Sequence, residues 1–318
     1  MDTNTKEYCY PLVEENLTDH TILTIFRGEK EKTIQTCIQI WKAMSDLPLD
    51  RHSLVINMGG GVICDMGGFC ASVFKRGLAF INCPTTLLSQ VDASIGGKLG
   101  IDFENYKNHI GLFREPNHVI ISSVFLNTLS QKELLSGCAE MIKHALIDSH
   151  VAWEKQKVMN TPIIPSDEQI SQSIQVKYRY VLQDPKENGI RKALNFGHTI
   201  GHAVESNLIE TKNISITHGE AVAIGLIAET WLSNQCLGLN KDNLNSICEY
   251  LINFFPKIDL HNISKQQFFD ALKQDKKNKG NKIIASLIRD IGDCVIDYPV
   301  SAELCWDSLN YYKLLSAQ

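Results

Sequence analysis

Three histidines on two glycine-containing segments most strongly constrain what this chain can fold into. Asn195, His198 and His202 fall at i, i+3 and i+7, so a helix would place the three side chains on one face. The glycines among them would let a second backbone approach closely. His218 opens a further apolar segment, and the intervening loop could fold back to bring its imidazole to the first two. The pattern indicates a metal site, although any one of these histidines is equally well explained as a core or capping residue.

A metal also needs an anionic ligand, and residues 137–144 offer one. Glu140 lies in an otherwise apolar helical stretch. With two imidazoles it would complete a set of two nitrogens and one carboxylate oxygen, which suits Zn²⁺ with an open position for a substrate oxygen. His144 lies one turn away and could also ligate. Lys143 could be a solvated helix charge or an intrahelical partner of Glu140, and the spacing leaves these alternatives open.

A glycine-rich segment near the start of the chain indicates an anion-binding loop. The apolar run 54–58 leads into glycines 59–61 and then into the helical stretch 62–68. Glycines permit close backbone approach, and free N–H groups at a helix start attract phosphate. The pattern differs from G-x-G-x-x-G, and by itself a plain tight turn explains it as well. Hydroxyls at 84–86 and a lysine after the glycines at 96–98 add to an anion-lined cleft.

Six motifs in order resemble the dehydroquinate synthase family of sugar phosphate cyclases across nearly the whole chain. They are GGGVICD at 59–65, PTTLLSQVDASIGGK at 84–98, KN at 107–108, SGCAE at 136–140, NFGHTIGHAVE at 195–205 and HGE at 218–220. One departure is Leu99, where the family commonly has Thr.

The resemblance assigns roles that the spacing left open. It implies that Glu140, His198 and His218 hold Zn²⁺ or Co²⁺, so that His144 is a neighbour of the site. It further implies that the catalytic residues are His202, Glu187 and Lys143.

The resemblance also implies contacts with NAD and with a sugar phosphate substrate. The NAD-binding positions are Asp2, Thr3, Asn4, Glu29, Lys32, Gly60, Gly61, Val62, Asp65, Thr85, Thr86, Lys107, Phe125, Leu126, Asn127 and Thr128. The substrate-binding positions are Arg76, Asp92, Lys98, Asn108, Lys177, Arg191, Asn195 and one of Lys276 and Lys277. Lys177 and Arg191 would hold a carboxylate, because Arg offers a bidentate fork. Arg76, Lys98, Asn108, Asn195, His202 and the 276–277 pair would hold phosphate.

The implied reaction converts 3-deoxy-D-arabino-heptulosonate 7-phosphate to 3-dehydroquinate and inorganic phosphate. NAD⁺ takes hydride and returns it, so it is catalytic and not consumed. The metal acidifies the alcohol and polarises the ketone that forms. The ketone acidifies a neighbouring C–H, phosphate leaves, and an intramolecular aldol step closes the carbocycle.

Composition agrees with a globular enzyme that acts on a small molecule. The chain has 318 residues, is 44% hydrophobic and carries a net charge of −5, so attraction of an anionic substrate must be local. No apolar run reaches membrane-spanning length, no signal peptide opens the chain, and nothing suggests nucleic acid binding. We therefore expect a cytoplasmic protein. Its ten cysteines are scattered, several among apolar residues, as reduced buried cysteines are.

The element pattern predicts an α/β NAD-binding domain at 1–123 and a mainly α-helical metal- and substrate-binding domain at 124–318. Apolar runs 283–288 and 294–296 predict a hairpin, and the active site is expected between the domains. In the family, a strand and helix precede the strand that delivers Asp2, Thr3 and Asn4, so the chain is expected to lack these first elements. The resemblance implies a homodimer in which Arg76 reaches the partner's site.

Three alternatives have their own discriminating features. A sugar phosphate cyclase acting on a heptulose phosphate without a carboxylate would leave Lys177 and Arg191 without a partner. A metal-dependent NAD polyol dehydrogenase would release NADH and would not need these cations. A non-catalytic nucleotide-binding relative is suggested only by the short N-terminus.

Overall fold

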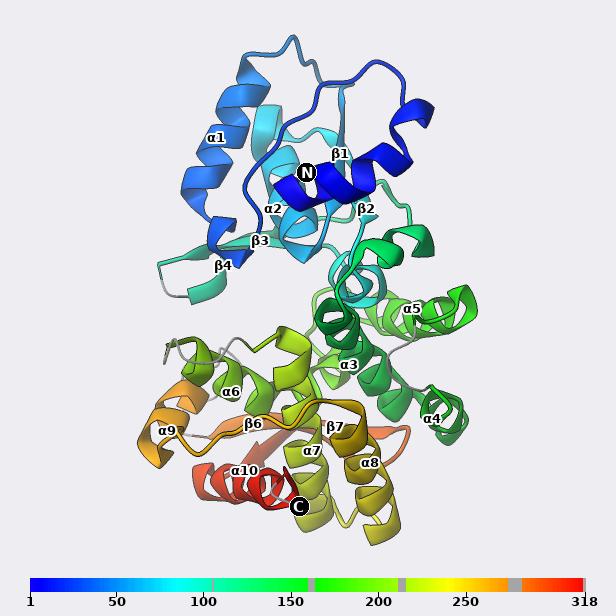
Figure 1. Cartoon of the computed structure of the whole chain (residues 1–318). Helices are drawn as coiled ribbons and strands as arrows, with labels where there is room; N and C mark the ends of the chain where they lie inside the picture. The colour runs from blue at the N-terminus through cyan, green and yellow to red at the C-terminus, as the bar shows by residue number, and fades with distance from the viewer. Residues whose placement is uncertain (105, 160–163, 211–215, 274–281, 317–318) are drawn as a thin grey trace. The chain divides into compact units, whose positions relative to one another are not determined.

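The computed structural model describes residues 1–104, 106–159, 164–210, 216–273 and 282–316 (Figure 1). The chain divides into two compact units. Unit 1 comprises Met1–Leu134 and Ser166–Ile174, and unit 2 comprises Leu135–Pro165 and Gln175–Gln318. The α/β first part and the mainly helical second part agree with the predicted fold class.

Unit 1 is built around a parallel sheet. Its strands β1 (Leu54–Gly59), β2 (Ala79–Pro84) and β5 (His118–Val119) are hydrogen-bonded in that order, with Leu54 opposite Ala79. Parallel neighbours need a crossover, and α2 (Gly61–Val73) supplies it between β1 and β2. The predicted succession of strand, glycine turn and helix is confirmed here.

Helix α2 lies against the sheet at very short range. A Cβ on Gly67 would lie 2.1 Å from Oδ1 of Asn57 in β1. The adjoining core contains Met66, Phe69 and Cys70 of α2 together with Phe80 of β2. The cysteines that lie among apolar residues in the sequence, Cys37, Cys64, Cys70, Cys83 and Cys138, are buried and free, as predicted.

The remaining elements of unit 1 flank this layer. They are α1 (Ile34–Ser45), the antiparallel strands β3 (Lys98–Phe103) and β4 (Tyr106–Phe113), and the short segments η1 (Thr5–Cys9), η2 (Tyr10–Leu12), η3 (Glu14–Asn16), η4 (Glu29–Glu31), η5 (Phe74–Arg76), η6 (Ser89–Ala93) and η7 (Ser123–Thr128).

The strand expected to deliver Asp2, Thr3 and Asn4 is represented only by an isolated bridge at Asp2. Asp2 makes an isolated parallel bridge with Ile25, and the chain is helical from Thr3. The reason is local, because the Asp2 carboxylate accepts the backbone N–H of Thr5 at 2.8 Å. An aspartate in that role starts a helix.

Unit 2 is mainly helical, with one antiparallel hairpin among its described residues. The helices are α3 (Gln131–Asp148, which begins in unit 1), α4 (His150–Lys157), α5 (Asp167–Gln183, which also begins in unit 1), α6 (His198–Glu210), α7 (His218–Leu237), α8 (Lys241–Phe254), α9 (Lys265–Lys273) and α10 (Ala302–Ser316), with the 3-10 segment η8 (Ile190–Asn195). The predicted hairpin is confirmed as β6 (Ile283–Asp290) and β7 (Asp293–Val300).

Helix α7 is the central element of unit 2. Its residues 219–230 are all buried, and it contacts α6, α8, α10 and β6 (Figure 1). A helix that is apolar on every face is stable only when other elements surround it. Within the described residues, no helix is long and apolar enough to cross a membrane.

Candidate metal centre and its surroundings

Three helices of unit 2 deliver the predicted metal ligands. Glu140 lies in the fully buried stretch of α3, while His198 and His218 are the first residues of α6 and α7. The start of α7 is set by a capping box, in which the Thr217 hydroxyl accepts the N–H of Glu220 and the Glu220 carboxylate accepts the N–H of Thr217. His218 is therefore held at a defined helix end.

The three side chains converge at one point. Oε1 of Glu140 lies 3.3 Å from Nε2 of His198 and 3.5 Å from Nε2 of His218. Among the described residues, no donor is aligned for a hydrogen bond to this oxygen, although it is completely buried. An orphaned buried carboxylate oxygen is costly, and a cation held jointly with the two imidazoles would satisfy it. The donor set fits Zn²⁺ or Co²⁺.

Contacts on the far side of each imidazole direct its Nε2 to this point. His198 Nδ1 lies 3.2 Å from the carbonyl oxygen of Phe196, and His218 Nδ1 lies 3.4 Å from Oε2 of Glu205. Both partners can only accept, so these contacts place the proton on Nδ1. When a metal is bound, the lone pair of each Nε2 would face this point, as in metal sites with an outer ring of acceptors.

The electrostatics of the cluster suit a cation. Burial raises the pKa of Glu140, but Lys143 and the imidazole of His198 outweigh it and hold that pKa well below its ordinary value. Burial lowers the pKa of His198 to about 4, so its imidazole is neutral at pH 7. Burial also lowers the pKa of His218, but Glu140 and Glu205 raise it overall to about 10. The same two carboxylates would stabilise a metal ion at this point.

The structure decides between the interpretations of Lys143, whereas His144 stays an alternative ligand. The Lys143 ammonium is buried and pairs with the Glu140 carboxylate one turn before it, so it is not a solvated charge. His144 is also fully buried on α3, and its ring lies close enough to Glu140 to share a possible donor group with it.

His202 lies beside the centre and is only partly buried. Its ring centroid is 5.2 Å from that of His198 and 5.9 Å from that of His218. His202, Glu205 and His218 form a second possible donor group that shares His218. The orphaned oxygen of Glu140 favours the first group for the metal and leaves His202 as a neighbouring acid–base candidate.

The chain before α6 departs from the expected single helix. Asn195 ends η8, and Gly197 has φ +83°, so α6 begins only at His198. A Cβ on Gly197 would meet the Leu226 side chain at 2.7 Å, and this close approach together with the left-handed backbone requires glycine. Asn195 is thus placed by a separate turn, and the predicted shared helical face is wrong for it.

The turn region that leads to Asn195 also contains the predicted site residues Glu187 and Arg191. The Asp184 carboxylate accepts the backbone N–H groups of Asn188, Gly189 and Arg191 at 2.7–3.2 Å. The Asn195 amide donates to Oε1 of Glu187 at 2.7 Å. These bonds fix a compact turn just before α6.

Two buried cations of unit 2 match the predicted carboxylate pair. Arg191 is 1% exposed and donates from Nη1 to the carbonyl oxygen of Pro185 at 2.7 Å. Lys177 is also buried, on α5. Charged groups at such depth are uncommon unless they are paired or functional.

Unit 1 places several predicted nucleotide contacts around the start of α2. Gly60, Gly61 and Val62 form that start, directly after β1. Lys32 donates to Oδ2 of Asp65 at 2.7 Å and to Oδ1 of Asn108 at 2.6 Å. Asn108, predicted to bind substrate, therefore belongs to the Lys32–Asp65 network.

The remaining predicted residues differ in exposure. Thr85, Phe125 and Leu126 are buried; Asp2, Thr3, Asn4, Thr86, Asp92 and Thr128 are half-buried; and Glu29, Arg76, Lys98, Lys107 and Asn127 are exposed. Lys276 and Lys277 lie outside the described residues.

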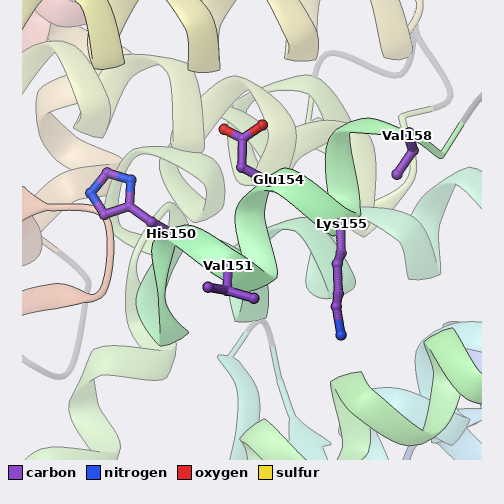
Figure 2. A pocket seen from close by; sticks show the side chains of 5 residues that line it. All are labelled: His150, Val151, Glu154, Lys155 and Val158. Atoms are coloured by element: carbon purple, nitrogen blue, oxygen red, sulfur yellow. The ribbon is translucent and has the colours of Figure 1, made fainter.

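A shallow apolar hollow on α4 is not part of this site. Figure 2 shows that the residues lining it are His150, Val151, Glu154, Lys155 and Val158, all from one helix or its end. No cluster of metal-ligating groups among the described residues includes any of them. A surface hollow on a single helix lacks the convergent polar groups of a catalytic pocket.

Comparison with known proteins identifies the family. Residues 22–136 match the family model "3-dehydroquinate synthase N-terminal", and residues 137–278 match "3-dehydroquinate synthase C-terminal". The chain belongs to the 3-dehydroquinate synthase family. A 3-dehydroquinate synthase from Parabacteroides distasonis is 43% identical to it, with 98% of this chain and 90% of that protein covered.

Solved structures extend the likeness of this 3-dehydroquinate synthase family member to its fold. 2-Deoxy-scyllo-inosose synthase, complexed with carbaglucose-6-phosphate, NAD⁺ and Co²⁺, has a TM-score of 0.85 at 23% identity over 98% of this chain and 88% of that one. A glycerol dehydrogenase from Schizosaccharomyces pombe has a TM-score of 0.65 at 16% identity over 99% and 82%. The fold is thus shared with cyclases and with dehydrogenases.

Sequence patterns missed two carboxylates of this family member. Glu205 lies within a quoted motif, seven residues after His198, and that helical spacing could have placed it on the same face. Glu229 is the one charged residue of α7 after its first turn, and this isolated charge is the available signal.

The close contact of α6 with α7 allows a test of the scaffold. A Cβ on Gly225 would lie 1.8 Å from the carbonyl oxygen of Gly197, so Gly225→Ala should push the helices apart. We expect a loss of about 1–3 kcal/mol in the free energy of unfolding. Gly61→Ala, whose Cβ would meet that of Ala93 at an ordinary 3.4 Å, is the control. Equal melting temperatures for the two variants would contradict the close contact.

Proposed function

We propose that this chain converts 3-deoxy-D-arabino-heptulosonate 7-phosphate to 3-dehydroquinate and phosphate, using NAD⁺ catalytically and a divalent metal. Family membership supports the reaction, and the single observation that supports the metal is the convergence of Glu140, His198 and His218 on one buried point. A metal there would lower the pKa of a substrate hydroxyl and polarise the ketone derived from it, while NAD⁺ would accept and return hydride.

The side chains beside the centre suit proton transfer. His202 is one turn from His198 and is partly open to solvent, and an imidazole is the side chain that most often transfers protons in catalysis. We assign it a proton-transfer role. Glu187, whose Oε1 accepts the Asn195 amide at 2.7 Å, would position Asn195 toward substrate, and Lys143 holds Glu140 in its ionised form.

Substrate binding needs cations for a carboxylate and for a phosphate. Buried Arg191 and Lys177 are proposed for the carboxylate, because a desolvated cation gains most from an anionic partner. The phosphate is assigned to Arg76, Lys98, Asn108, Asn195, His202 and the 276–277 lysine pair, with Asp92 also at the substrate. The net charge of −5 makes such local cations necessary.

NAD is assigned to unit 1. The start of α2 at Gly60, Gly61 and Val62 presents backbone N–H groups to a pyrophosphate. Asp65 and Lys32 form a polar network four residues into that helix. The NAD⁺ and Co²⁺ in the 2-deoxy-scyllo-inosose synthase complex support these cofactors for this chain. We further propose a homodimer in the cytoplasm.

Two other functions share the fold. A cyclase acting on a substrate without a carboxylate would not use Arg191 and Lys177 in the role proposed above. A polyol dehydrogenase would let NADH leave. One experiment separates them: protein, NAD⁺, Zn²⁺ and the heptulosonate phosphate are incubated, and phosphate and NADH absorbance are followed. Phosphate equal to substrate consumed without NADH supports the proposal; accumulating NADH, or no phosphate, contradicts it.

The contact of Glu205 with His218 predicts an effect on metal affinity. Glu205→Gln removes the charge that holds the Nδ1 proton of His218, so metal affinity should fall roughly 10–100-fold. Chelator competition measures it. The control is Asn207→Ala on the same helix, which removes a bond to the Ala203 carbonyl and should leave metal affinity unchanged. An unchanged affinity in Glu205→Gln would refute the role.

A further inference from the structure

Glu229 is a fully buried carboxyl group in the middle of α7, three helical turns beyond His218. Its Oε2 accepts the backbone N–H of Gly197 at 2.7 Å, and its Oε1 accepts that of Ile200 at 2.9 Å. These two N–H groups flank His198. A buried carboxyl group is costly unless it is hydrogen-bonded, and Glu229 directs both of its oxygens to the start of the metal-binding helix.

The two bonds reproduce a capping box between helices. In an ordinary capping box, the side chain of the residue before the helix accepts the N–H of the third helical residue, and the side chain of that third residue accepts the N–H of the residue before the helix. Helix α7 does this with Thr217 and Glu220. Helix α6 has Gly197 and Ile200 at these two positions, which have no side chain able to accept, and Glu229 serves both N–H groups.

The Glu229 carboxylate also affects the electrostatic potential at the proposed metal site. His198 and His218 are the first residues of their helices, so the positive ends of two helix dipoles meet beside the proposed cation. Glu220 at the start of α7 and Glu229 at the start of α6 each offset one of these ends. Because Glu229 accepts the N–H groups of Gly197 and Ile200, the His198 side chain is not needed to cap α6.

Because α6 packs closely against α7, the two hydrogen bonds to Glu229 can determine where α6 lies along α7. Cβ atoms built on Gly197 and Gly201 of the α6 segment would meet Leu226 and Ala221 of α7, so the two helices run antiparallel in contact. Gly197 and Gly201 contribute no side chains of their own to this crossing that would set the height of α6 along α7. The bonds from Glu229 can set it.

We propose that Glu229 is a positioning residue for the metal centre, which sets the placement of His198 by capping α6 from α7. The inference rests on the proposed metal site. Glu229→Gln keeps the size of the side chain but replaces one acceptor oxygen by an amide that cannot accept an N–H. The affinity for Co²⁺ should therefore fall at least roughly tenfold, as for other outer-shell partners, and the visible d–d spectrum of the Co²⁺ protein should change.

The matched control is Ser233→Ala, one turn further along α7. The Ser233 hydroxyl accepts the N–H of Ile288 in β6 at 3.0 Å, so this variant loses a buried tie of the same helix to another element. We expect a lower melting temperature in both variants, but an unchanged Co²⁺ affinity and spectrum in Ser233→Ala alone. Glu229→Asp keeps the charge on a shorter side chain, so its Co²⁺ affinity should lie between those of the wild type and Glu229→Gln. It replaces Glu229→Gln if that variant is insoluble.

The measurements are equilibrium competition with a chelator and absorption spectroscopy of the Co²⁺-loaded protein. A Glu229 variant with wild-type Co²⁺ affinity and spectrum would overturn the inference and leave only a structural role. Failure of the wild type itself to bind Co²⁺ would overturn the metal site, and this inference with it. The two failures are therefore distinguishable.

Discussion

Glu140→Gln is expected to abolish metal binding and phosphate release together. The substitution keeps the shape of the side chain but removes the anion that the His198 and His218 nitrogens approach at 3.3 and 3.5 Å. Loss of the metal removes several kcal/mol of transition-state stabilisation, which corresponds to about a thousandfold or more in rate. His198→Ala and His218→Ala should behave alike. Metal content after gel filtration and phosphate release are the measurements.

The melting temperature tests the same assignment of metal ligands without a measurement of catalysis. A metal that binds only the folded chain raises its melting temperature, and a chelator reverses this. The wild type should lose thermal stability in EDTA, whereas the three ligand variants should not respond. His144→Ala is the control on α3: it opens a cavity at a buried site, so it melts earlier but should retain metal. Metal loss in His144→Ala with retention in Glu140→Gln would reverse the ligand assignment.

Arg191→Ala should lower kcat/KM by the equivalent of about 3 kcal/mol or more, or roughly 150-fold, if its guanidinium pairs with the substrate carboxylate. The side chain is 1% exposed, so its charge is screened little by water. Arg191→Lys should recover only part of the loss, because an ammonium lacks the bidentate fork. The comparison is made between the natural substrate and an analogue without the carboxylate.

The neighbouring cation supplies the control for this prediction. Lys192 pairs with Asp297 at 2.6 Å and is partly exposed, so Lys192→Ala should change kcat/KM little. Arg191→Ala should also lose most of its discrimination against the analogue. If wild type and Arg191→Ala discriminate equally, the carboxylate binds elsewhere.

Local patterns in the sequence were sufficient for the elements whose structure depends on nearby residues. The apolar run 54–58, its glycines and the following helix became β1 and α2, because strand, turn and helix start are set by adjacent residues. The hairpin of β6 and β7 follows from two apolar runs and a short polar turn. The residue types of the metal set were likewise visible, but the choice of Glu140 over His144 came from the family resemblance.

Tertiary structure decided what depends on approach between distant segments. The break at Gly197 arises because Leu226 of α7 lies where a side chain would be, and sequence periodicity carries no trace of that contact. Lys32 and Asn108 are 76 residues apart, and Glu229 and Gly197 are 32 apart, yet each pair is hydrogen-bonded. Periodicity reports which face of an element is apolar. It does not report which polar group from another element reaches an unpaired N–H or carboxylate, because packing alone brings those atoms together.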